Sequence, residues 1–340
     1  MSVSFSKKNI IAIAMSGGVD SSTVAAIMLS EGYEVFGLTM NFHKSAQNDI
    51  EDSAKICKIL GISHFVVDFK NEFHEKVIKT FRTYYENGMT PNPCALCNRY
   101  IKIGLLVKEA IDKGANFLAT GHYVKRTETS LLSEATNKSK DQSYFLALAK
   151  KENLKRMMFP LGDMKSKNET REIAQKYGLH NFEKKESQDM CFAHDESYFP
   201  ENIGEIIHIR TGEILGKHSG IHNYTIGQRK GLSVSYKNPL YVIRIDCKRN
   251  SILVGEKELL NRKNFVIRKI NWIIEKEQEF KIHVKLRSSC KKTLAKVQKL
   301  DNSSANVELL ENTDTPVANG QICAMYDGEC VVGGGIIWEE

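Results

Sequence analysis

The sequence has few of the residues that mark fibrous, disordered or cross-linked proteins. Its 340 residues include only six prolines, eight cysteines and two tryptophans. With 41% hydrophobic and 26% charged residues, this composition excludes collagen-like structure and wholesale disorder. Because domains cluster at roughly 100 to 200 residues, we expect two or three domains.

A long uninterrupted apolar run is also missing. A membrane-spanning helix needs roughly 18 or more apolar residues, and no stretch of this sequence approaches that length. The apolar residues 10–15 follow Lys7 and Lys8, but they are too few for a secretory signal and lead into a glycine-rich turn. We therefore expect a cytoplasmic protein with no membrane partner.

The cysteines are too sparse for a disulfide scaffold, which holds above about 8% cysteine. Their only close pair is Cys94-x-x-Cys97, and the other spacings are irregular. In a reducing compartment such thiols are buried, catalytic or metal-bound.

The positive charge is unevenly distributed. Residues 1–205 hold 27 Lys and Arg against 26 Asp and Glu, and residues 206–340 hold 21 against 15, so most of the net charge of +7 lies in the second part. Such a surplus favours a polyanionic partner such as nucleic acid, although a solvated basic face is the simpler alternative.

The first part alternates short apolar runs with helical patterns. Strands are expected at 10–15, 33–40, 64–69 and 117–120, and helices at 20–30, 52–60, 72–85 and 99–111. Residues 141–180 are expected to be helical, with a capping box at 166–169. The alternation predicts an α/β domain with a mostly parallel sheet, which binds ligands at the carboxyl ends of its strands.

Past residue 205, short alternating segments replace the helical pattern, at 240–246, 251–255, 280–287 and 323–326. We predict a central β-rich domain at 206–264 and a C-terminal β-barrel at 265–340, after the α/β domain at 1–205. In the segment 280–287, alternation predicts a basic outer face made of Lys281, His283, Lys285 and Arg287.

Residues 14–22 (AMSGGVDSS) follow an apolar strand and open a helix. In this geometry, backbone N–H groups and the positive end of the helix hold phosphate. The two glycines let the backbone approach an anion, and the hydroxyls of Ser16, Ser21 and Ser22 add donors. No lysine follows, so this is not a Walker A loop. An ordinary strand-to-helix turn is the alternative.

Two further motifs contain cysteine. In residues 90–99 (TPNPCALCNR), two prolines stiffen the loop and Cys97 falls at the start of an expected helix. The helix dipole lowers a thiol pKa below its free value of about 8.5, so we expect a thiolate at neutral pH. Residues 187–192 (SQDMCF) carry Cys191, which taken alone is more simply a small core residue.

Together these motifs resemble those of the tRNA-specific 2-thiouridylases (MnmA), in the PP-loop ATP pyrophosphatase superfamily. Further matches lie at 120–123 (TGHY), 140–146 (KDQSYFL), 224–232 (YTIGQRKGL) and 333–337 (GGGII), in the family's order along nearly the whole chain. The resemblance implies ATP-dependent 2-thiolation of the wobble uridine of tRNAs for lysine, glutamate and glutamine. The uracil C2 oxygen would be adenylated, with release of pyrophosphate, and sulfur would then displace AMP.

The resemblance also implies residue roles. Cys191 would carry a persulfide, and Cys97 would assist sulfur release and form a disulfide with Cys191. The partners would be the anticodon arm of tRNA and a sulfur donor, either a cysteine desulfurase or a sulfur relay protein. ATP, with Mg²⁺, would contact Ala14, Met15, Ser16, Gly17, Gly18, Val19, Asp20, Ser21, Met40 and Gly121. For Asp20, help in holding Mg²⁺ and capping of its own helix are both open.

By the same resemblance, tRNA would contact Asn92, Pro93, Cys94, His122, Lys140, Asp141, Gln142, Arg287, Ser288 and Gln321. The segment 92–94 would face the target base, which must flip out to reach the α-phosphate. Ser288 stands where the family has tyrosine, so one stacking ring is missing. The basic face at 281–287 would run along tRNA phosphate.

Cys94 is a second departure, because many family members have aspartate there. With Cys97 and Cys191 it gives three thiols, which leaves an iron–sulfur cluster open as an alternative to persulfide chemistry. A structural zinc lacks a fourth ligand, and we predict no other metal site. Two rival functions remain: an amidating synthetase of the PP-loop type, which needs no paired thiols, and a tRNA-binding protein with a vestigial ATP site.

Overall fold

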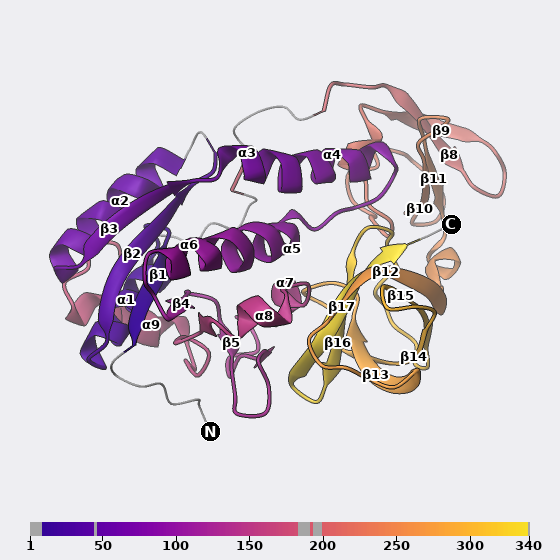
Figure 1. Cartoon of the computed structure of the whole chain (residues 1–340). Coiled ribbons are helices and arrows are strands. Elements are labelled where there is room, and N and C mark those ends of the chain that lie inside the picture. Colours follow the sequence, from indigo (N-terminus) through magenta and orange to yellow (C-terminus); the bar gives the residue numbers. More distant parts are fainter. Residues whose placement is uncertain (1–8, 44–45, 183–190, 193–198, 339–340) are drawn as a thin grey trace. The chain divides into compact units, whose positions relative to one another are not determined.

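The structure is a computed structural model that describes residues 9–43, 46–182, 191–192 and 199–338. The chain forms two compact units (Figure 1). The first contains residues 1–77, 94–196 and 329–331, and the second contains residues 78–93, 197–328 and 332–340. The backbone therefore passes between the units several times rather than once.

A parallel sheet organises the first unit. In the described residues it has five strands in the order β3-β2-β1-β4-β7, and every neighbouring pair is parallel. The strands are β1 (Ile10–Met15), β2 (Glu34–Asn41), β3 (Ser63–Asp68), β4 (Phe117–Ala119) and β7 (Met157–Met158). Because β2 and β4 flank β1 on opposite sides, the strand order reverses at β1, which is where such sheets bind ligands.

Helices cover this sheet. They are α1 (Val19–Ser30), α2 (Ala46–Leu60), α3 (Lys70–Phe73), η1 (His74–Ile78), α5 (Pro93–Cys97), η2 (Asn98–Leu105), α6 (Leu106–Asp112), α7 (Ser143–Leu146), α8 (Lys151–Leu154) and α9 (Lys167–Lys176). The segments η1 and η2 are π-helical. α1 packs on β1, β2 and α9, and α6 packs on β4. The core formed by β1, α1 and α2 includes Ile11, Ile13, Val24 and Ile56, all with 0% exposure.

The predicted α/β pattern is confirmed up to β4, with two shifted helix starts and one error after it. The helix expected at 52–60 begins at Ala46. The helix expected at 99–111 begins at Pro93, since proline suits the first turn of a helix. Residues 141–180 are not one helical stretch. They contain the short helices α7 and α8, the strand β7 and then α9, because Met157 is buried and extends the sheet beside β4. The capping box is confirmed by the Glu169 N–H, which donates to Ser166 Oγ over 3.3 Å.

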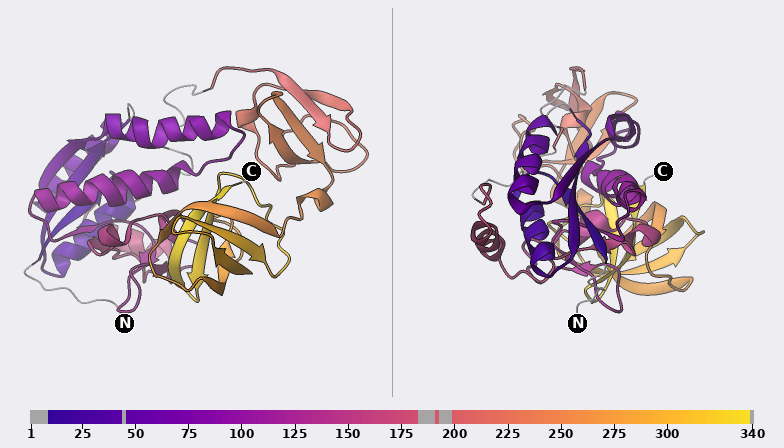
Figure 2. Two further views of the ribbon diagram at one scale, coloured as in Figure 1. Left: turned by 45° about the vertical axis from the view of Figure 1, so that its right-hand side comes forward. Right: turned by 60° about the vertical axis from the view of Figure 1, so that its left-hand side comes forward.

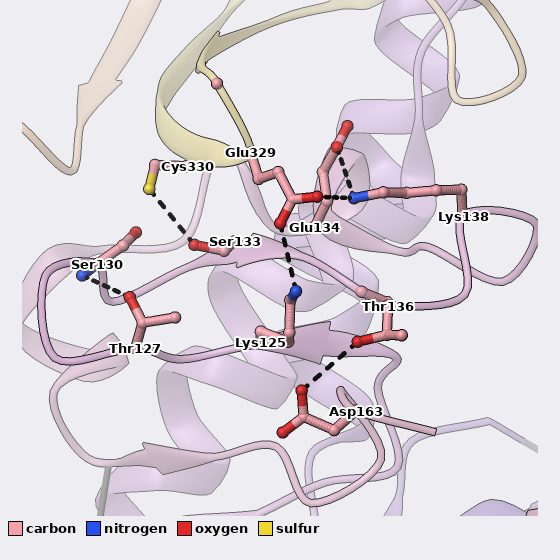
Figure 3. Close-up of polar contacts among 12 residues, drawn as sticks. Lys125, Thr127, Ser130, Ser133, Glu134, Thr136, Lys138, Asp163, Glu329 and Cys330 are labelled. Carbon is pink, nitrogen blue, oxygen red and sulfur yellow. Dashed lines mark hydrogen bonds and ion pairs between the residues drawn. The ribbon is translucent and has the colours of Figure 1, made fainter. Parts of the chain in front are cut away.

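A small hairpin completes the first unit (Figure 3). Its strands are β5 (Val124–Lys125) and β6 (Ser133–Glu134), and Cys330 pairs with Ser133. The Glu329 carboxylate accepts from Lys138 Nζ over 2.6 Å and lies 3.3 Å from Lys125 Nζ. Three residues from near the end of the sequence are thus part of the first unit.

The second unit holds two β assemblies. The smaller has the strand order β10-β11-β8-β9, with β8 (Gly204–His208), β9 (Ile214–His218), β10 (Tyr241–Asp246) and β11 (Ser251–Gly255). Its core is formed by Ile206, Val242, Ile252 and Val254, each fully buried. The 3-10 turns η3 (Ile221–Asn223) and η4 (Lys257–Leu260) and the helix α4 (Lys79–Glu86) also belong to the second unit.

The larger assembly is a closed barrel, drawn orange to yellow in Figure 2. Its described strands follow the order β12-β15-β14-β13-β16-β17, and pairing of β12 with β17 closes the ring. They are β12 (Asn264–Trp272), β13 (Glu279–Lys285), β14 (Thr293–Lys299), β15 (Ser304–Leu309), β16 (Ile322–Asp327) and β17 (Cys330–Trp338). The predicted barrel is therefore confirmed, and so is the inward direction of Ile282 and Val284 on β13. No helix in the described ranges is long and apolar enough to cross a membrane.

Candidate active site

The glycine-rich segment forms a turn from the end of β1 to the start of α1. Ser16 N–H donates to Ser21 Oγ over 3.2 Å, and the hydroxyls of Ser21 and Ser22 donate to Gly18 O over 3.0 and 2.9 Å. These bonds fold the loop over the first turn of the helix. Gly18 is the N-cap residue of α1, and no side chain accepts a hydrogen bond as a cap at this end of the helix. This is the backbone geometry that suits phosphate.

Gly17 is required by its surroundings. Its φ is +65°, and a Cβ there would lie 2.9 Å from Asp52 Cβ and 3.0 Å from Asp49 O. Behind the loop, the Asn181 side-chain amide donates to Gly17 O over 3.1 Å and to Ser22 Oγ over 2.9 Å. Asn181 is buried, so the loop is held from the protein side as well as by its own hydroxyls.

The other predicted ATP contacts lie at the same edge of the sheet. Met40 is near the carboxyl end of β2, and Gly121 follows β4. A Cβ at Gly121 would lie 2.8 Å from Asp20 Cβ and 3.1 Å from Ser21 N. The ends of β1, β2 and β4 thus meet beside one loop, and a glycine permits the closest approach.

Asp20 does not cap its own helix, so that interpretation is wrong. It is the second residue of α1, and its Oδ1 accepts from Tyr123 Oη over 2.8 Å and from Lys167 Nζ over 2.6 Å. Tyr123 Oη also lies 2.9 Å from Thr170 Oγ1. The Asp20 carboxylate therefore ties the first turn of α1 to α9 and to the segment after β4.

Cys97 lies inside a helix and not at its start, which corrects the sequence expectation. The helical run begins at Pro93 and continues through α5, η2 and α6. Asn98 Nδ2 donates to Phe145 O over 3.3 Å, and an Arg99 guanidinium N–H donates to Leu148 O over 3.2 Å. These bonds fix the turn after Cys97 against α7 and the residues that follow it. The π-helical turns of η2 begin at the next residue, and such turns are frequent at functional sites.

The prediction of a Cys97 thiolate at neutral pH is also wrong for this conformation. Burial is the main reason why the pKa of Cys97 is raised to about 12. Among the smaller effects, the charge of Lys102 lowers this pKa and the charges of Cys191 and Cys94 raise it. Desolvation therefore outweighs the helix dipole. Cys97 is a protonated thiol at pH 7.

Cys191 and Cys94 are both exposed thiols. Because each of them affects the pKa of Cys97, each lies close enough to the Cys97 sulfur to interact with it electrostatically. Phe192 beside Cys191 is buried, with its ring 5.8 Å from that of Phe73. Cys191 is therefore not the core residue that its sequence alone suggests. The rest of its motif, residues 187–190, lies outside the described residues.

His122 is half-buried beside Thr120, whose Oγ1 lies 2.9 Å from His122 Nδ1. Burial, with the positive charge of Lys102, lowers the pKa of His122 to about 3. The imidazole is consequently neutral over the physiological range. Lys102 thus acts on His122 and on both cysteines of the 94–97 segment.

The segment 140–142 supports the site from within the protein. Asp141 accepts from the backbone of Ala135 over 3.0 Å and from Ser143 Oγ over 2.7 Å. Gln142 Oε1 accepts from Tyr123 N over 3.0 Å. Lys140 is half-buried on the same turn. Gln142 therefore holds the 121–123 segment and Asp141 holds its own turn against Ala135, while the contact of both residues with tRNA stays a prediction.

The remaining predicted tRNA residues belong to the second unit or border it. Gln321 Nε2 donates to Thr90 O over 3.0 Å, and Thr90 N donates to Asn319 O over 2.8 Å. Asn92 and Pro93 follow directly on that loop. Arg287 donates to Ile226 O over 2.7 Å, so its guanidinium is engaged by the central β assembly, whereas Ser288 is exposed.

Sequence reasoning missed three residues of this site: Lys102, Lys167 and Asn181. Lys102 follows Cys97 in the same helical run, and the sequence alone shows this short spacing. Lys167 and Asn181 are far from the glycine-rich loop in sequence, and only the packing of α9 on α1 brings them to it. Among the described residues, no group of three or more His, Cys, Asp and Glu is arranged to hold a metal ion.

A parallel sheet with a phosphate-type loop at its switch point, and no lysine in that loop, defines a nucleotide-using α/β enzyme of the PP-loop class. The family described as "tRNA methyl transferase HUP domain" matches residues 9–195, more than half of the chain. Residues 196–256 match the "tRNA methyl transferase PRC-barrel domain", and residues 262–337 match the "Aminomethyltransferase beta-barrel domain".

Curated relatives identify the family more closely. The chain is 42% identical over 359 residues to the tRNA-specific 2-thiouridylase MnmA of Rickettsia canadensis, which covers 97% of this chain and 96% of the relative. It is 41% identical to that of Rickettsia conorii over 98% of this chain and 96% of the relative. The chain therefore belongs to the tRNA-specific 2-thiouridylase (MnmA) family of ATP-using sulfurtransferases.

Solved structures are more distant. The U34-tRNA thiolase NcsA from Methanococcus maripaludis with its [4Fe-4S] cluster is 20% identical, covers 55% of this chain and 61% of its own, and has a TM-score of 0.37. A 4-thiouridine synthetase–RNA complex with bound ATP is 17% identical, covers 55% and 45%, and has the same TM-score. At such scores neither structure bears on the function of this chain.

Proposed function

We propose that this protein thiolates the C2 position of the wobble uridine in tRNAs for lysine, glutamate and glutamine, at the expense of ATP. Family membership over nearly the whole chain carries the proposal. The loop at 16–18, the exposed Cys191 and the nearby Cys97 supply the chemistry that the reaction needs. Its expected place is the cytoplasm, where tRNA and ATP are present.

Activation of the base is the first step. The uracil C2 oxygen bonds to the α-phosphorus of Mg²⁺-bound ATP, the bond from that phosphorus to the bridging oxygen breaks, and pyrophosphate leaves with the electron pair. The N3 proton is released to solvent. The loop fits the phosphates, because its Ser16, Ser21 and Gly18 groups surround the N-terminus of α1. Adenylation turns a poor leaving oxygen into AMP.

Sulfur transfer follows. The donor protein first leaves a persulfide on Cys191, which solvent exposure makes reachable. The terminal sulfur attacks C2 and AMP departs. The Cys97 sulfur then attacks Cys191 Sγ, so that the electron pair of the S–S bond goes to the transferred sulfur and a Cys97–Cys191 disulfide forms. A dithiol reductant must restore the two thiols. Since Cys97 is protonated here, it must lose its proton before the attack, and Lys102 favours that loss.

The iron–sulfur alternative does not fit the described residues. Cys94, Cys97 and Cys191 are all within the described ranges, yet they form no set arranged to hold a metal. Iron and sulfide assay after anaerobic purification separates the two chemistries. A colourless, iron-free protein that thiolates tRNA supports the persulfide route, and an obligatory iron content would refute it.

The description of the matching family names methyl transfer, but the paired thiols favour sulfur transfer. The decisive experiment is nucleoside mass spectrometry of tRNA incubated with the protein, ATP, Mg²⁺ and a persulfide donor. We expect 2-thiouridine at the wobble position and no methylated product. An amidating synthetase would form pyrophosphate without tRNA.

Cysteine variants test the proposed roles. Cys97→Ser and Cys191→Ser should each lower thiolation by about a thousandfold or more, because each removes a sulfur that forms or breaks a bond. Affinity for tRNA should change by less than about threefold, since no phosphate contact is lost. Cys247→Ser, at another exposed thiol, is the matched control. Full activity in either site variant would overturn the mechanism.

A further inference from the structure

The motif at 224–228 (YTIGQ) has no role in the proposed reaction, yet it forms a firmly braced turn. Thr225 N donates to Gln228 Oε1 over 3.0 Å, and Gln228 N donates to Thr225 O over 2.9 Å. Gly227 N donates to Val242 O over 2.7 Å, and Val242 N donates to Gln228 O over 2.9 Å. Because Val242 is fully buried in β10, these bonds fasten the turn to the smaller β assembly.

The same turn packs on the barrel. Gly227 has φ +84°, and a Cβ there would clash with Cγ of Pro316, which lies between β15 and β16. An Arg287 guanidinium N–H, from the segment after β13, donates to Ile226 O over 2.7 Å. In this part of the second unit, the smaller β assembly and the barrel thus form one support.

Thr90 is the residue that this support holds. Its side chain and backbone are 7% exposed, and its N–H, C=O and hydroxyl groups each have a hydrogen-bond partner. The hydroxyl donates to Thr225 Oγ1 over 3.5 Å. The N–H donates to Asn319 O over 2.8 Å, and the C=O accepts from Gln321 Nε2 over 3.0 Å. Turns that are 135 and 231 positions away in the sequence therefore bond to this single residue.

The helix α4 and the turn that follows it are held by the smaller β assembly as well. The ring of Phe199 lies 5.5 Å from that of Tyr85 in α4 and stacks at 4.5 Å on that of His222 in η3. A Cβ at Gly88 would lie 3.2 Å from Ile245 O in β10. The chain is thus anchored along the whole stretch that leads to the cysteine segment.

The position of Thr90 in the chain gives these contacts their importance. Only Pro91 and Asn92 separate it from the helical run that begins at Pro93 and contains Cys97. Because each proline fixes its φ, this short connection transmits a displacement of Thr90 rather than absorbing it. In a reaction that must bring a sulfur and a base within bonding distance, an error of about 1 Å can cost on the order of a hundredfold in rate.

We propose that the 224–228 turn positions the segment 92–97 for catalysis. Thr225 and Thr90 are the positioning residues through which it acts. This role, which rests on the proposed function, gives the smaller β assembly a part in the reaction other than contact with tRNA. Changes in the turn should therefore lower the rate of turnover and leave the affinity for tRNA as it is.

Two glycine variants of the full-length protein test the turn. Gly227→Ala forces a Cβ against the Pro316 ring, so it should lower kcat for 2-thiouridine formation about tenfold or more and change the KM for tRNA by less than about twofold. Gly231→Ala is the matched control, because Gly231 has φ +79° but a Cβ there would meet only Gln228 Nε2, at 3.7 Å. With similar backbone strain and no clash, its kcat should stay within about threefold of wild type.

Threonine variants test the hydroxyl contact without backbone strain. Thr225→Val keeps the shape of the side chain and removes its hydroxyl, so kcat should fall about threefold to tenfold, and Thr225→Ser should restore it. Thr211→Val is the control in the same assembly, where the Thr211 hydroxyl lies 3.2 Å from His208 Nδ1. Amide hydrogen exchange of residues 88–97 should become faster in Thr225→Val and Gly227→Ala but not in the two controls.

A merely structural role has a different signature. In that case Gly227→Ala and Gly231→Ala would lower the melting temperature alike and leave kcat and the amide exchange of 88–97 at wild-type values, which would overturn the proposal. A raised KM for tRNA with normal kcat would also overturn it, because the turn would then be a tRNA contact. If Gly227→Ala does not fold, the Thr225 variants give the same comparison.

Failure of this positioning role and failure of the proposed function are distinguishable, because amide exchange does not depend on the reaction. Wild-type protein that forms 2-thiouridine, together with turn variants of normal kcat, would refute only the role of the turn. Wild-type protein that forms no 2-thiouridine would refute the function, and the exchange of residues 88–97 would still show whether the turn holds them.

Discussion

Burial decides the chemistry of single residues at this site. Cys97 is 6% exposed, and its high pKa follows from the loss of water around the sulfur. Its position in the sequence after two prolines suggests the opposite, because the helix start is misjudged by a few residues. The identity of the residue is therefore predictable from sequence, whereas its protonation state depends on neighbours such as Lys102 that only the fold brings near.

The reactivity of Cys97 should report this state. Only the thiolate is alkylated, so with a pKa of about 12 the rate of iodoacetamide labelling at Cys97 should rise about tenfold per pH unit from pH 7 to pH 11. In urea the same cysteine should approach a plateau above about pH 9. Peptide mass spectrometry measures both. A plateau below pH 9 in the folded protein would contradict the buried thiol.

His122 gives a second pH test. Its pKa of about 3 means that proton binding is disfavoured in the folded state, so the imidazole resonances should not shift between pH 5 and 8. Unfolded protein provides the control, since a free imidazole titrates near 6.5. An NMR titration of His122 with a midpoint near neutrality would show that the site is open to water.

At the scale of elements, the loop before Pro93 is fixed from the barrel side. Gly320 has φ +88°, and a Cβ there would lie 2.9 Å from both Met89 Cβ and Thr90 N. The turn at 319–321 also bonds Thr90 through Asn319 O and Gln321 Nε2. Sequence reasoning finds Gln321 as a candidate for tRNA contact but misses this second role, because the contact joins positions more than 200 residues apart.

Gly320→Ala should therefore destabilise the protein by about 2 to 4 kcal/mol, the sum of a strained φ and a backbone clash. Gly328→Ala is a matched control, since Gly328 has φ +60° but nothing lies within 4 Å of its Cβ position. Its cost should be about 1 kcal/mol. Urea denaturation measures both, and equal destabilisation by the two variants would mean that the loop moves aside freely.

For the whole molecule, periodicity and glycine placement predict the fold class, an α/β sheet followed by two β assemblies of which the second is a barrel. The path of the chain between the two units is not predictable in this way. Short strands such as β7 carry too few residues for a period, and the assignment of residues 78–93 and 329–331 depends on packing between distant segments. The charge asymmetry is likewise visible in sequence, but Arg287 is engaged by Ile226 O, so the exposed basic face of β13 consists of fewer groups than alternation suggests.

Binding of tRNA should depend on that face. Lys281 is exposed and Lys285 half-exposed on β13. If each contacts a phosphate, Lys281→Ala and Lys285→Ala should weaken tRNA binding and each lower the salt slope of log K by about 1. Lys257→Ala, at an exposed lysine paired with Asp314 over 2.9 Å, is the control. Unchanged salt slopes would mean that the β13 face is only solvated.

The contacts of Glu329 with Lys125 and Lys138 have a consequence for the making of the protein (Figure 3). The ribosome synthesises the parallel sheet early, but residues 329–331, which complete the first unit, are synthesised long after β7. Until then the β5–β6 hairpin lacks the partner at Cys330. A truncated chain that lacks residues 329–331 would thus contain the glycine-rich loop in an incomplete first unit. Its β6 edge would be unpaired, and such an edge favours aggregation or degradation over partial activity.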